Sequence, residues 1–291
     1  MLCRERRELE ERWDRRRFNP KTDSSRPAKS AIYCSFAVEN YIITGARNRS
    51  ICFYEFEQEE RALSIIFRIK DAHAGSVLCM EVDLLGGGGA GTMYTGGSDG
   101  RVNVWDLDGV LTEWSTFRGK PVLVKSMVGH EAGVLDLVVD NHRVLSCSKD
   151  GTVRVWCRNS LTSTAQVDLL GGPINCIALH QETGILVAAG CHGKITFYDL
   201  ETMKPLQRCR SQTRDTVACV GFYDDLVVWG DTHLRLAQMG TGRVMFEQSA
   251  DTELIRCFTI MPRTGRVITG SYSNQVGVCL SVYLASPTSH D

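Results

Sequence analysis

Two stretches of the chain decide the fold: MYTGGSDGRVNVWDL at residues 93–107 and VLSCSKDGTVRVWCR at residues 144–158. Each consists of a short strand, an Asp-Gly turn and a second strand in which every other residue is apolar, which is typical of a β-hairpin. Weaker copies appear when the chain is aligned on the turn residue, which is Asn48, Asp99, Asp150, His192, Asp231 or Ser273. In all six copies the third and fifth residues after this position are apolar. The sequence therefore predicts an all-β protein made of repeats of one unit.

A second repeated feature is a cysteine on the strand upstream of the hairpins. Five of the six copies carry a cysteine at one position of that strand, and the third copy has Asp136 instead; the cysteines are Cys34, Cys79, Cys176, Cys219 and Cys257. With 12 cysteines in the chain, a disulfide framework, a metal site and reduced core packing compete as explanations. No CxxC pair occurs, and a free cysteine packs as a small hydrophobe. We therefore predict reduced core thiols, no metal site and no cofactor.

Composition narrows the class of partner. The chain has 291 residues, of which 43% are hydrophobic and 23% charged, and its formal net charge is -1. That balance argues against nucleic acid or an anionic membrane as the main partner. No apolar run approaches the roughly 20 residues of a membrane span, and the N-terminus is charged where a signal peptide would be apolar. We expect an intracellular protein, cytoplasmic or nuclear.

The repeats resemble the WD-repeat β-propeller family. The resemblance rests on units of about 40–45 residues with four strands each, on Ala72-His73 and Gly129-His130, and on Trp105-Asp106. It implies a propeller of four-stranded blades, six in number or an incomplete set of seven, that start near residues 31, 76, 133, 173, 216 and 254. It also implies a hydrogen-bonded set in two blades, each linked through a Ser or Thr of the intervening strand: His73 with Asp99 and Trp105, and His130 with Asp150 and Trp156. The other four units lack this histidine, and we expect apolar packing alone to hold them.

The termini are expected to differ in structure from the repeats. Residues 1–18 have strong helix formers without Gly or Pro and predict a short charged helix or linker, and residues 19–291 are assigned to the propeller. The sixth blade has no obvious outermost strand. We expect residues near 17–22 to supply it, with Ser281–Ala285 as the competing source.

Catalytic motifs are largely absent from the sequence. Gly86, Gly88 and Gly91 match GxGxxG, but a strand follows them where a dinucleotide-binding motif needs the N-terminus of a helix. There is no Walker A run, GxSxG elbow or HExxH pair. We predict a non-catalytic protein and keep a propeller enzyme as the minority hypothesis.

The residue before each turn residue predicts a binding surface. In the WD-repeat family this position commonly contacts ligands, and it is occupied here by Arg47, Ser98, Lys149, Cys191, Gly230 and Tyr272. Arg47 and Lys149 suit phosphate or carboxylate oxygens, and Tyr272 suits an apolar anchor. Arg214, in the loop entering the fifth blade, is expected to lie near them. We call these five residues the rim residues: Arg47, Ser98, Lys149, Arg214 and Tyr272. The alternative is that these cations are simply solvated.

A narrower resemblance concerns the start of the chain. The stretch RERRELEERWDRRRFNPKT, with Trp13, Arg17 and Phe18, resembles the linker between F-box and propeller in F-box/WD-repeat proteins. TGARNRSICFYE resembles that family's turn in which an Arg helps bind a phosphorylated degron; Arg47 matches the Arg, and Asn48 replaces the usual Asp. This implies the substrate-recognition part of an SCF-type ubiquitin ligase, with a protein or peptide ligand that is acidic or phosphorylated. Ligase components are expected as partners only if an F-box lies upstream. The rival is a generic scaffold in a signalling, chromatin or RNA-processing complex.

Overall fold

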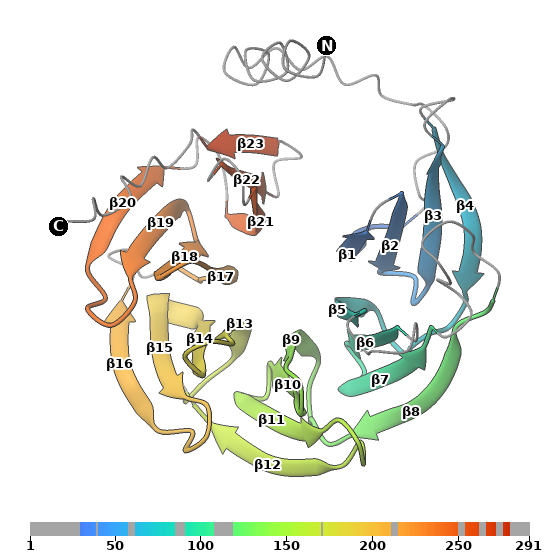
Figure 1. Ribbon diagram of the computed structural model, residues 1–291, viewed down its shortest axis with the longest axis horizontal. Coiled ribbons are helices and arrows are strands. Elements are labelled where there is room, and N and C mark those ends of the chain that lie inside the picture. The colour runs from blue at the N-terminus through green and yellow to red at the C-terminus, as the bar shows by residue number, and fades with distance from the viewer. Residues whose placement is uncertain are drawn as a thin grey trace, which may run out of the picture.

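The protein is an all-β propeller. The computed structural model describes residues 30–38, 40–57, 62–84, 91–107, 119–169, 171–210, 215–249, 254–261, 266–271 and 276–279. The described strands form six separate sheets, five with four strands and one with three. The sheets stand around a common centre, with the first strand of each innermost (Figure 1).

Each sheet is an antiparallel meander of consecutive strands, and we refer to the sheets as blades one to six in chain order. Blade one contains β1 (Ile32–Val38), β2 (Tyr41–Ala46), β3 (Ile51–Glu57) and β4 (Ala62–Ile69). Blade two contains β5 (Val77–Asp83), β6 (Thr92–Gly97), β7 (Arg101–Asp106) and β8 (Val122–Val128). Blade three contains β9 (Val134–Val139), β10 (Arg143–Ser148), β11 (Thr152–Cys157) and β12 (Ser163–Asp168).

The remaining blades repeat this order. Blade four contains β13 (Ile174–His180), β14 (Ile185–Gly190), β15 (Lys194–Asp199) and β16 (Pro205–Arg210), with a 3₁₀ turn η1 (Cys191–Gly193) before β15. Blade five contains β17 (Cys219–Tyr223), β18 (Leu226–Gly230), β19 (His233–Gln238) and β20 (Val244–Ser249). Blade six contains β21 (Ile255–Met261), β22 (Arg266–Ser271) and β23 (Val276–Cys279).

The prediction of four-stranded blades is met by five sheets, so a propeller of six or seven such blades was wrong for the described chain. Blade six shows three strands there, because no fourth strand pairs with β23 among the described residues. The two segments predicted to complete it, residues 17–22 and 281–285, lie outside the described residues, as does the predicted helix of residues 1–18.

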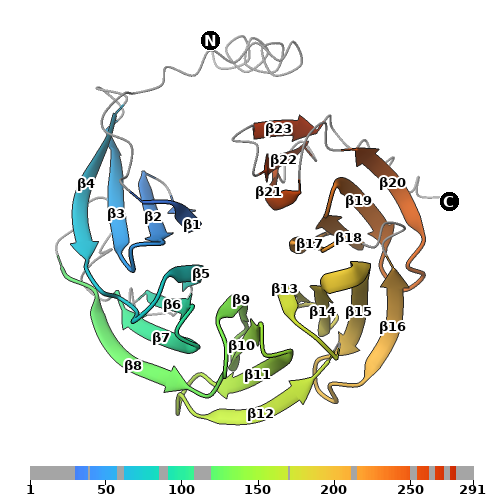
Figure 2. The ribbon, with the colours of Figure 1, turned by 180° about the vertical axis from the view of Figure 1, so that it is seen from behind.

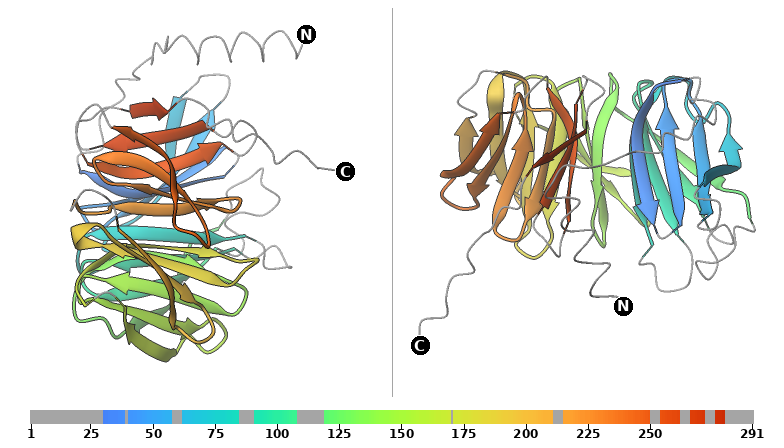
Figure 3. Two further views of the ribbon diagram at one scale, coloured as in Figure 1. Left: turned by 90° about the vertical axis from the view of Figure 1, so that its left-hand side faces the viewer. Right: turned by 90° about the horizontal axis from the view of Figure 1, so that it is seen from above.

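The strands run across the thickness of a disc (Figure 3). Since neighbouring strands are antiparallel, successive turns alternate between the two faces of the disc. The β2–β3, β6–β7 and β10–β11 turns, which contain Asn48, Asp99 and Asp150, therefore share one face, which we call the turn face. The β5–β6, β9–β10 and β13–β14 connections lie on the opposite face.

A repeated contact locks consecutive blades together. A Cβ built on Gly45 would lie 2.5 Å from the Cys34 Sγ and 2.6 Å from the Val77 Cγ1 of the next blade. The same trio recurs as Gly96, Cys79 and Val134, and as Gly230, Cys219 and Ile255. Glycine is needed because the cysteine and the next blade already fill the space of a side chain. The recurring cysteine is thus explained by packing, and the ten cysteines whose side chains the structure describes are all free.

Asp136 is the exception in that register and also joins two blades. One of its carboxylate oxygens accepts the Leu137 N–H at 2.9 Å, and the other accepts the Ile177 N–H of blade four at 3.0 Å. Burial raises the pKa of this carboxyl to about 7, although the two backbone hydrogen bonds oppose the shift. Asp136 therefore ties blade three to blade four.

Candidate functional site

Blade two contains a connected polar set that starts at the turn face. His73 Nδ1 lies 3.1 Å from an Asp99 carboxylate oxygen, and His73 Nε2 lies 2.9 Å from Thr95 Oγ1. Trp105 Nε1 donates to the same Thr95 oxygen at 2.9 Å. An ionised carboxylate only accepts, so Nδ1 carries the imidazole proton and Nε2 accepts the threonine hydroxyl. The set therefore runs from the turn to the third strand of the blade.

Blade three repeats this arrangement with serine in place of threonine. His130 Nδ1 lies 2.9 Å from Asp150, His130 Nε2 lies 2.8 Å from Ser146 Oγ, and Trp156 Nε1 donates to Ser146 at 2.9 Å. Burial lowers the pKa of both His73 and His130, and this outweighs the pull of their aspartates. Both imidazoles are therefore held neutral, as structural groups whose hydrogen-bonding atoms are occupied.

The aspartates of these sets also pin the turn backbone. Burial alone would raise the pKa of Asp150, but hydrogen bonds from Thr152, His130 and the Glu131 N–H lower it to about 2. Asp99 likewise accepts the Ala74 N–H at 2.8 Å, and its pKa is lowered. The turn face of blades two and three is rigid as a result.

Blade five corrects the prediction that apolar packing alone holds the blades without a histidine. Arg235 is completely buried, pairs with the equally buried Asp231, and donates to Glu247 Oε1 at 3.0 Å. Asp231 also accepts the His233 N–H at 2.7 Å. The sequence shows here a charged residue between two apolar ones, Leu234 and Leu236.

Three of the rim residues occupy equivalent places on the turn face. The backbone N–H groups of Arg47, Ser98 and Lys149 donate to the carbonyl oxygens of Ala31, Ser76 and Gly133 at 2.8, 2.9 and 3.1 Å. Each acceptor directly precedes the innermost strand of the same blade. All three side chains are exposed, one from each of blades one to three. Arg214 and Tyr272 lie outside the described residues.

The cations on this part of the turn face differ in whether they form ion pairs. Arg49, beside Arg47 on the turn face, pairs with Asp71 at 2.7 Å. Within the described part of the chain, neither Arg47 nor Lys149 forms an ion pair. Ser98 Oγ accepts the Ser76 N–H at 2.8 Å, which leaves its own hydroxyl hydrogen available to donate. Two cations and one hydroxyl therefore face solvent at matched positions.

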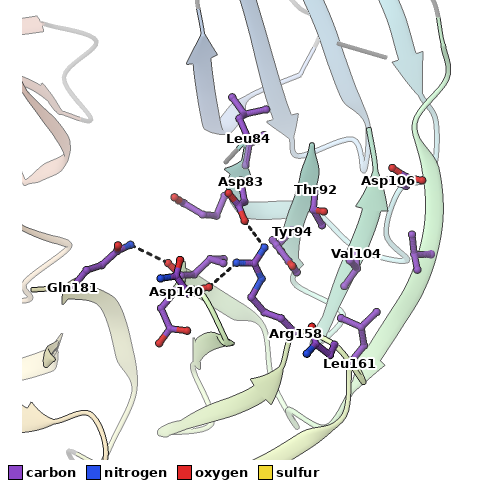
Figure 4. A pocket seen from close by; sticks show the side chains of 16 residues that line it. Asp83, Leu84, Thr92, Tyr94, Val104, Asp106, Asp140, Arg158, Leu161 and Gln181 are labelled. Carbon is purple, nitrogen blue, oxygen red and sulfur yellow. Dashed lines mark hydrogen bonds and ion pairs between the residues drawn. The ribbon is translucent and has the colours of Figure 1, made fainter. Parts of the chain in front are cut away.

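A cavity of about 970 Å³ opens on the opposite face between blades two and three (Figure 4). Arg158 crosses it, donating to the Asp140 carbonyl oxygen at 2.7 Å and to the Asp83 carboxylate of blade two. Val124 of β8 lines the cavity, and Val122, Leu123 and Val124 are all exposed. This site has no signal in the sequence, because its residues come from strand ends and connections of three blades, and Asp83 and Arg158 lie 75 positions apart in the chain.

The cavity is acidic overall. Glu81, Asp83, Asp106 and Asp140 line it against one cation, Arg158. Burial, followed by the Asp136 and Asp83 carboxylates, raises the pKa of Glu81 to about 7. No group of residues with metal-ligand geometry is found in the described ranges, and no described helix is long and apolar enough to cross a membrane.

Comparison with known proteins agrees with the repeat analysis. The family model described as "WD domain, G-beta repeat" matches residues 121–157, which run from the start of β8 to the end of β11. Striatin of Mus musculus is 23% identical over 217 residues, covering 69% of this chain and 27% of striatin. The DDB1- and CUL4-associated factor 11 homolog of Caenorhabditis elegans is 33% identical over 131 residues, covering 44% of this chain and 20% of that protein.

A third relative matches a shorter stretch at higher identity. WD repeat-containing protein 1-B of Xenopus laevis is 37% identical over 89 residues, covering 30% of this chain and 13% of that protein. The chain thus spans about a quarter of the length of the striatins it matches.

Proposed function

Because this chain is built of WD40 repeats folded as a β-propeller, we propose that it is a protein-interaction module whose turn face binds an acidic or phosphorylated peptide. The proposal rests on one observation. Arg47, Ser98 and Lys149 are exposed at equivalent turns of three consecutive blades, each fixed by the same backbone hydrogen bond.

The chemistry of these side chains suits an oxyanion. The Arg47 guanidinium can grip two oxygens of a carboxylate or phosphate with parallel N–H donors, and Lys149 adds a point charge. The Ser98 hydroxyl, on the blade between them, can donate to a further oxygen. A rigid turn face costs little conformational entropy when the ligand binds. Arg214 and Tyr272 are proposed to extend the same surface.

A charge-reversal pair tests the proposal. Arg47→Glu with Lys149→Glu should abolish binding to an array of phosphoserine and phosphothreonine peptides, while the melting temperature stays nearly unchanged because both side chains are exposed. Lys204→Glu with Arg243→Glu makes the same change of charge at β-turns of the opposite face, and this control should retain binding. Retained binding in the first variant would refute the proposal.

The finer role that we propose is substrate recognition in a ubiquitin ligase. Two observations support it: the resemblance of residues 4–22 to an F-box/WD-repeat linker, and the similarity of 44% of this chain to a relative named as associated with DDB1 and CUL4. The rival role is a scaffold subunit of a signalling, chromatin or RNA-processing complex.

Affinity purification of the chain from its native locus, with a C-terminal tag, separates these roles. Recovery of the F-box adaptor with a cullin, or of DDB1 with CUL4, is the expected result for a substrate receptor. Recovery of neither set would reject the ligase role and leave the scaffold.

A further inference from the structure

The cavity on the face opposite the turn face has one continuous wall on blade two. Residues that oppose each other in antiparallel strands direct their side chains to the same side of the sheet. Two such rows across β5, β6 and β7 line the cavity: Glu81, Tyr94 and Val104, and then Asp83, Thr92 and Asp106. Connections of blades three and four supply the facing wall, which includes Asn159 and Gln181. At about 970 Å³ the cavity is large enough for a short peptide segment.

The cations around the cavity are engaged within the chain. Arg158 donates to the Asp140 carbonyl oxygen and to the Asp83 carboxylate, so both ends of its guanidinium are occupied (Figure 4). The Asp140 carboxylate pairs with Arg143 Nε at 2.9 Å. Lys125 of β8 does not line the cavity, and its ammonium group donates to a backbone carbonyl oxygen of blade three at 3.2 Å. Each of these cations thus has a partner inside the protein.

Glu81 is the carboxylate of the cavity wall that lacks such a partner. Among the described residues, it forms no hydrogen bond or ion pair. Burial, followed by the Asp136 and Asp83 carboxylates that repel it, raises the pKa of Glu81 to about 7. A half-buried carboxylate without a donor or a cation costs free energy. A cation placed beside Glu81 in the cavity would recover part of that cost.

The strand beside the cavity exposes apolar side chains. Figures 1 and 2 show β8 along the outer edge of the disc. Four of its seven residues are apolar and between 47% and 66% exposed: Val122, Leu123, Val124 and Val128. In contrast, the outer strand β12 of blade three exposes no large apolar side chain. Because Val124 is also part of the cavity wall, the apolar surface of β8 adjoins the acidic cavity.

We propose that the cavity binds a peptide segment of a partner protein in which an arginine or a lysine lies next to an apolar residue. The cationic side chain pairs with the Glu81 carboxylate, and the apolar residue packs on Val124 and its exposed neighbours in β8. Charge complementarity identifies this occupant, because the carboxylate attracts a cation and repels an acidic peptide. The apolar strand favours a peptide over a small hydrophilic cation, since only the peptide covers both surfaces.

This site is separate from the peptide site proposed on the turn face. The two sites lie on opposite faces of the disc and select ligands of opposite charge. The Arg47→Glu, Lys149→Glu chain should therefore bind a basic peptide as well as the wild-type chain does. Either proposal can fail while the other holds.

Thiol modification tests whether the cavity is open and negative. In the purified full chain, the thiol of Thr92→Cys should react about tenfold faster with a trimethylammonium methanethiosulfonate than with its sulfonate counterpart, because the cavity attracts the cation. Adding Glu81→Gln should lower this ratio at least threefold. Peptide mass spectrometry separates this thiol from the native ones. No reaction with either reagent would show that the chain fills its own cavity, and the proposal would then be wrong.

A random peptide library tests the expected ligand. Beads that carry seven-residue peptides without cysteine are incubated with the fluorescent Arg47→Glu, Lys149→Glu chain, so that the turn face does not contribute. Peptides from the labelled beads are then sequenced. They should be enriched at least fivefold in arginine or lysine next to a large apolar residue. A captured set without this enrichment would refute the proposal.

Removal of one charge tests the role of Glu81. Glu81→Gln keeps the shape of the side chain and should weaken binding of the selected peptides at least tenfold. Its melting temperature should not fall, because the variant relieves repulsion among carboxylates. Asp225→Asn removes an exposed carboxylate from the β17–β18 turn of the same face, and this matched control should bind normally. Equal affinities of the wild-type and Glu81→Gln chains would contradict the proposed ion pair.

A variant that leaves the charge unchanged tests the location of the site. Asn159→Trp, at an exposed position of the facing wall, should block the cavity and abolish binding of the same peptides. Gln166→Trp makes the same change from an amide to an indole on the outer strand β12, away from the cavity wall, and should retain binding. Normal binding by the Asn159→Trp chain would place the peptide elsewhere and overturn the proposal.

Discussion

Blade three buries a neutral imidazole between Asp150 and Ser146, whereas blade five buries a charged guanidinium between Asp231 and Glu247. Both sets connect the aspartate of the turn to the strands of the same blade. In blade three, Trp156 completes the set through its indole N–H, while in blade five Arg235 spans from the turn to the fourth strand directly.

The difference shows that the backbone repeat does not demand one set of side chains. The backbone N–H groups of the turn need a buried carboxylate as their acceptor. Either an imidazole or a guanidinium can donate the further hydrogen bonds that this carboxylate requires. The two solutions differ in their response to mutation and to pH. An imidazole can lose or gain a proton near neutrality, whereas a guanidinium keeps its charge.

The largest expected effect comes from removing the aromatic residue of blade three. Trp156→Ala should lower the free energy of unfolding by about 3–5 kcal/mol, because it empties a large buried site and leaves Ser146 without the indole donor. Urea denaturation of the full chain measures this loss. Trp156→Phe, which keeps most of the volume, should cost clearly less; a near-neutral Trp156→Ala would mean that this set does not hold the blade.

Breaking the ion pair of blade five should cost slightly less. Arg235→Met should lower the free energy of unfolding by about 3–4 kcal/mol, since it leaves the completely buried Asp231 carboxylate without its cation. Arg243→Met, at an exposed position of the same blade, is the matched control and should change stability by less than about 0.5 kcal/mol.

The double variant Arg235→Met with Asp231→Leu sharpens that comparison. Removing both charges should recover part of the loss, because no uncompensated charge remains buried. A double variant less stable than Arg235→Met alone would show that Asp231 matters chiefly as the acceptor of the His233 N–H.

The smallest expected effect is the pH dependence that the His130 imidazole gives to the free energy of unfolding. Because burial lowers the folded-state pKa of His130 below its unfolded value of about 6.5, the unfolded chain takes up the proton first as the pH falls. Stability from this group is present above pH of about 6.5 and declines below it, by at most about 1.4 kcal/mol per pH unit.

Hydrogen exchange at pH 7 and pH 5, corrected for intrinsic rates, measures this contribution when the wild-type chain is compared with a His130→Asn variant. The Asp136 carboxyl of the same blade, whose pKa is raised to about 7, titrates in both chains and cancels in the comparison. Amides of β10 and β11 should lose more protection at pH 5 in the wild-type chain than in the variant, and equal changes in the two chains would count against the neutral imidazole.

The repeat pattern predicted much of the fold. Alternating apolar residues after a turn residue identified antiparallel hairpins, and the resemblance to the WD-repeat family implied four-stranded blades, which five sheets show. The positions of the cysteines predicted packing within the blades. A glycine opposite Cys34, Cys79, Cys219 and Cys257, or Ala189 opposite Cys176, explains why a small side chain is required. These features depend on short-range periodicity, which a single sequence displays directly.

The buried ion pair of blade five escaped the sequence analysis for a physical reason. Arg235 occupies a strand position that alternation alone would assign to a partly exposed side chain, and its charge argued for solvent. Only the packing of Asp231 and Glu247 around it makes burial tolerable. The cavity at Arg158 likewise depends on two blades meeting, since Asp83 and Arg158 are far apart in the chain.

The sequence by itself determined the unit: a hairpin with an Asp-type turn, a small residue on the innermost strand, and an apolar residue before it. These follow from local alternation and from the turn, which act within a few residues. The tertiary structure decided in which copies of the unit this apolar residue is buried. Val77 and Ile32 hold the same place in the repeat, yet Val77 is completely buried against Gly45 and Cys34 of blade one whereas Ile32 is 49% exposed, because burial depends on the neighbouring blade and not on the strand itself.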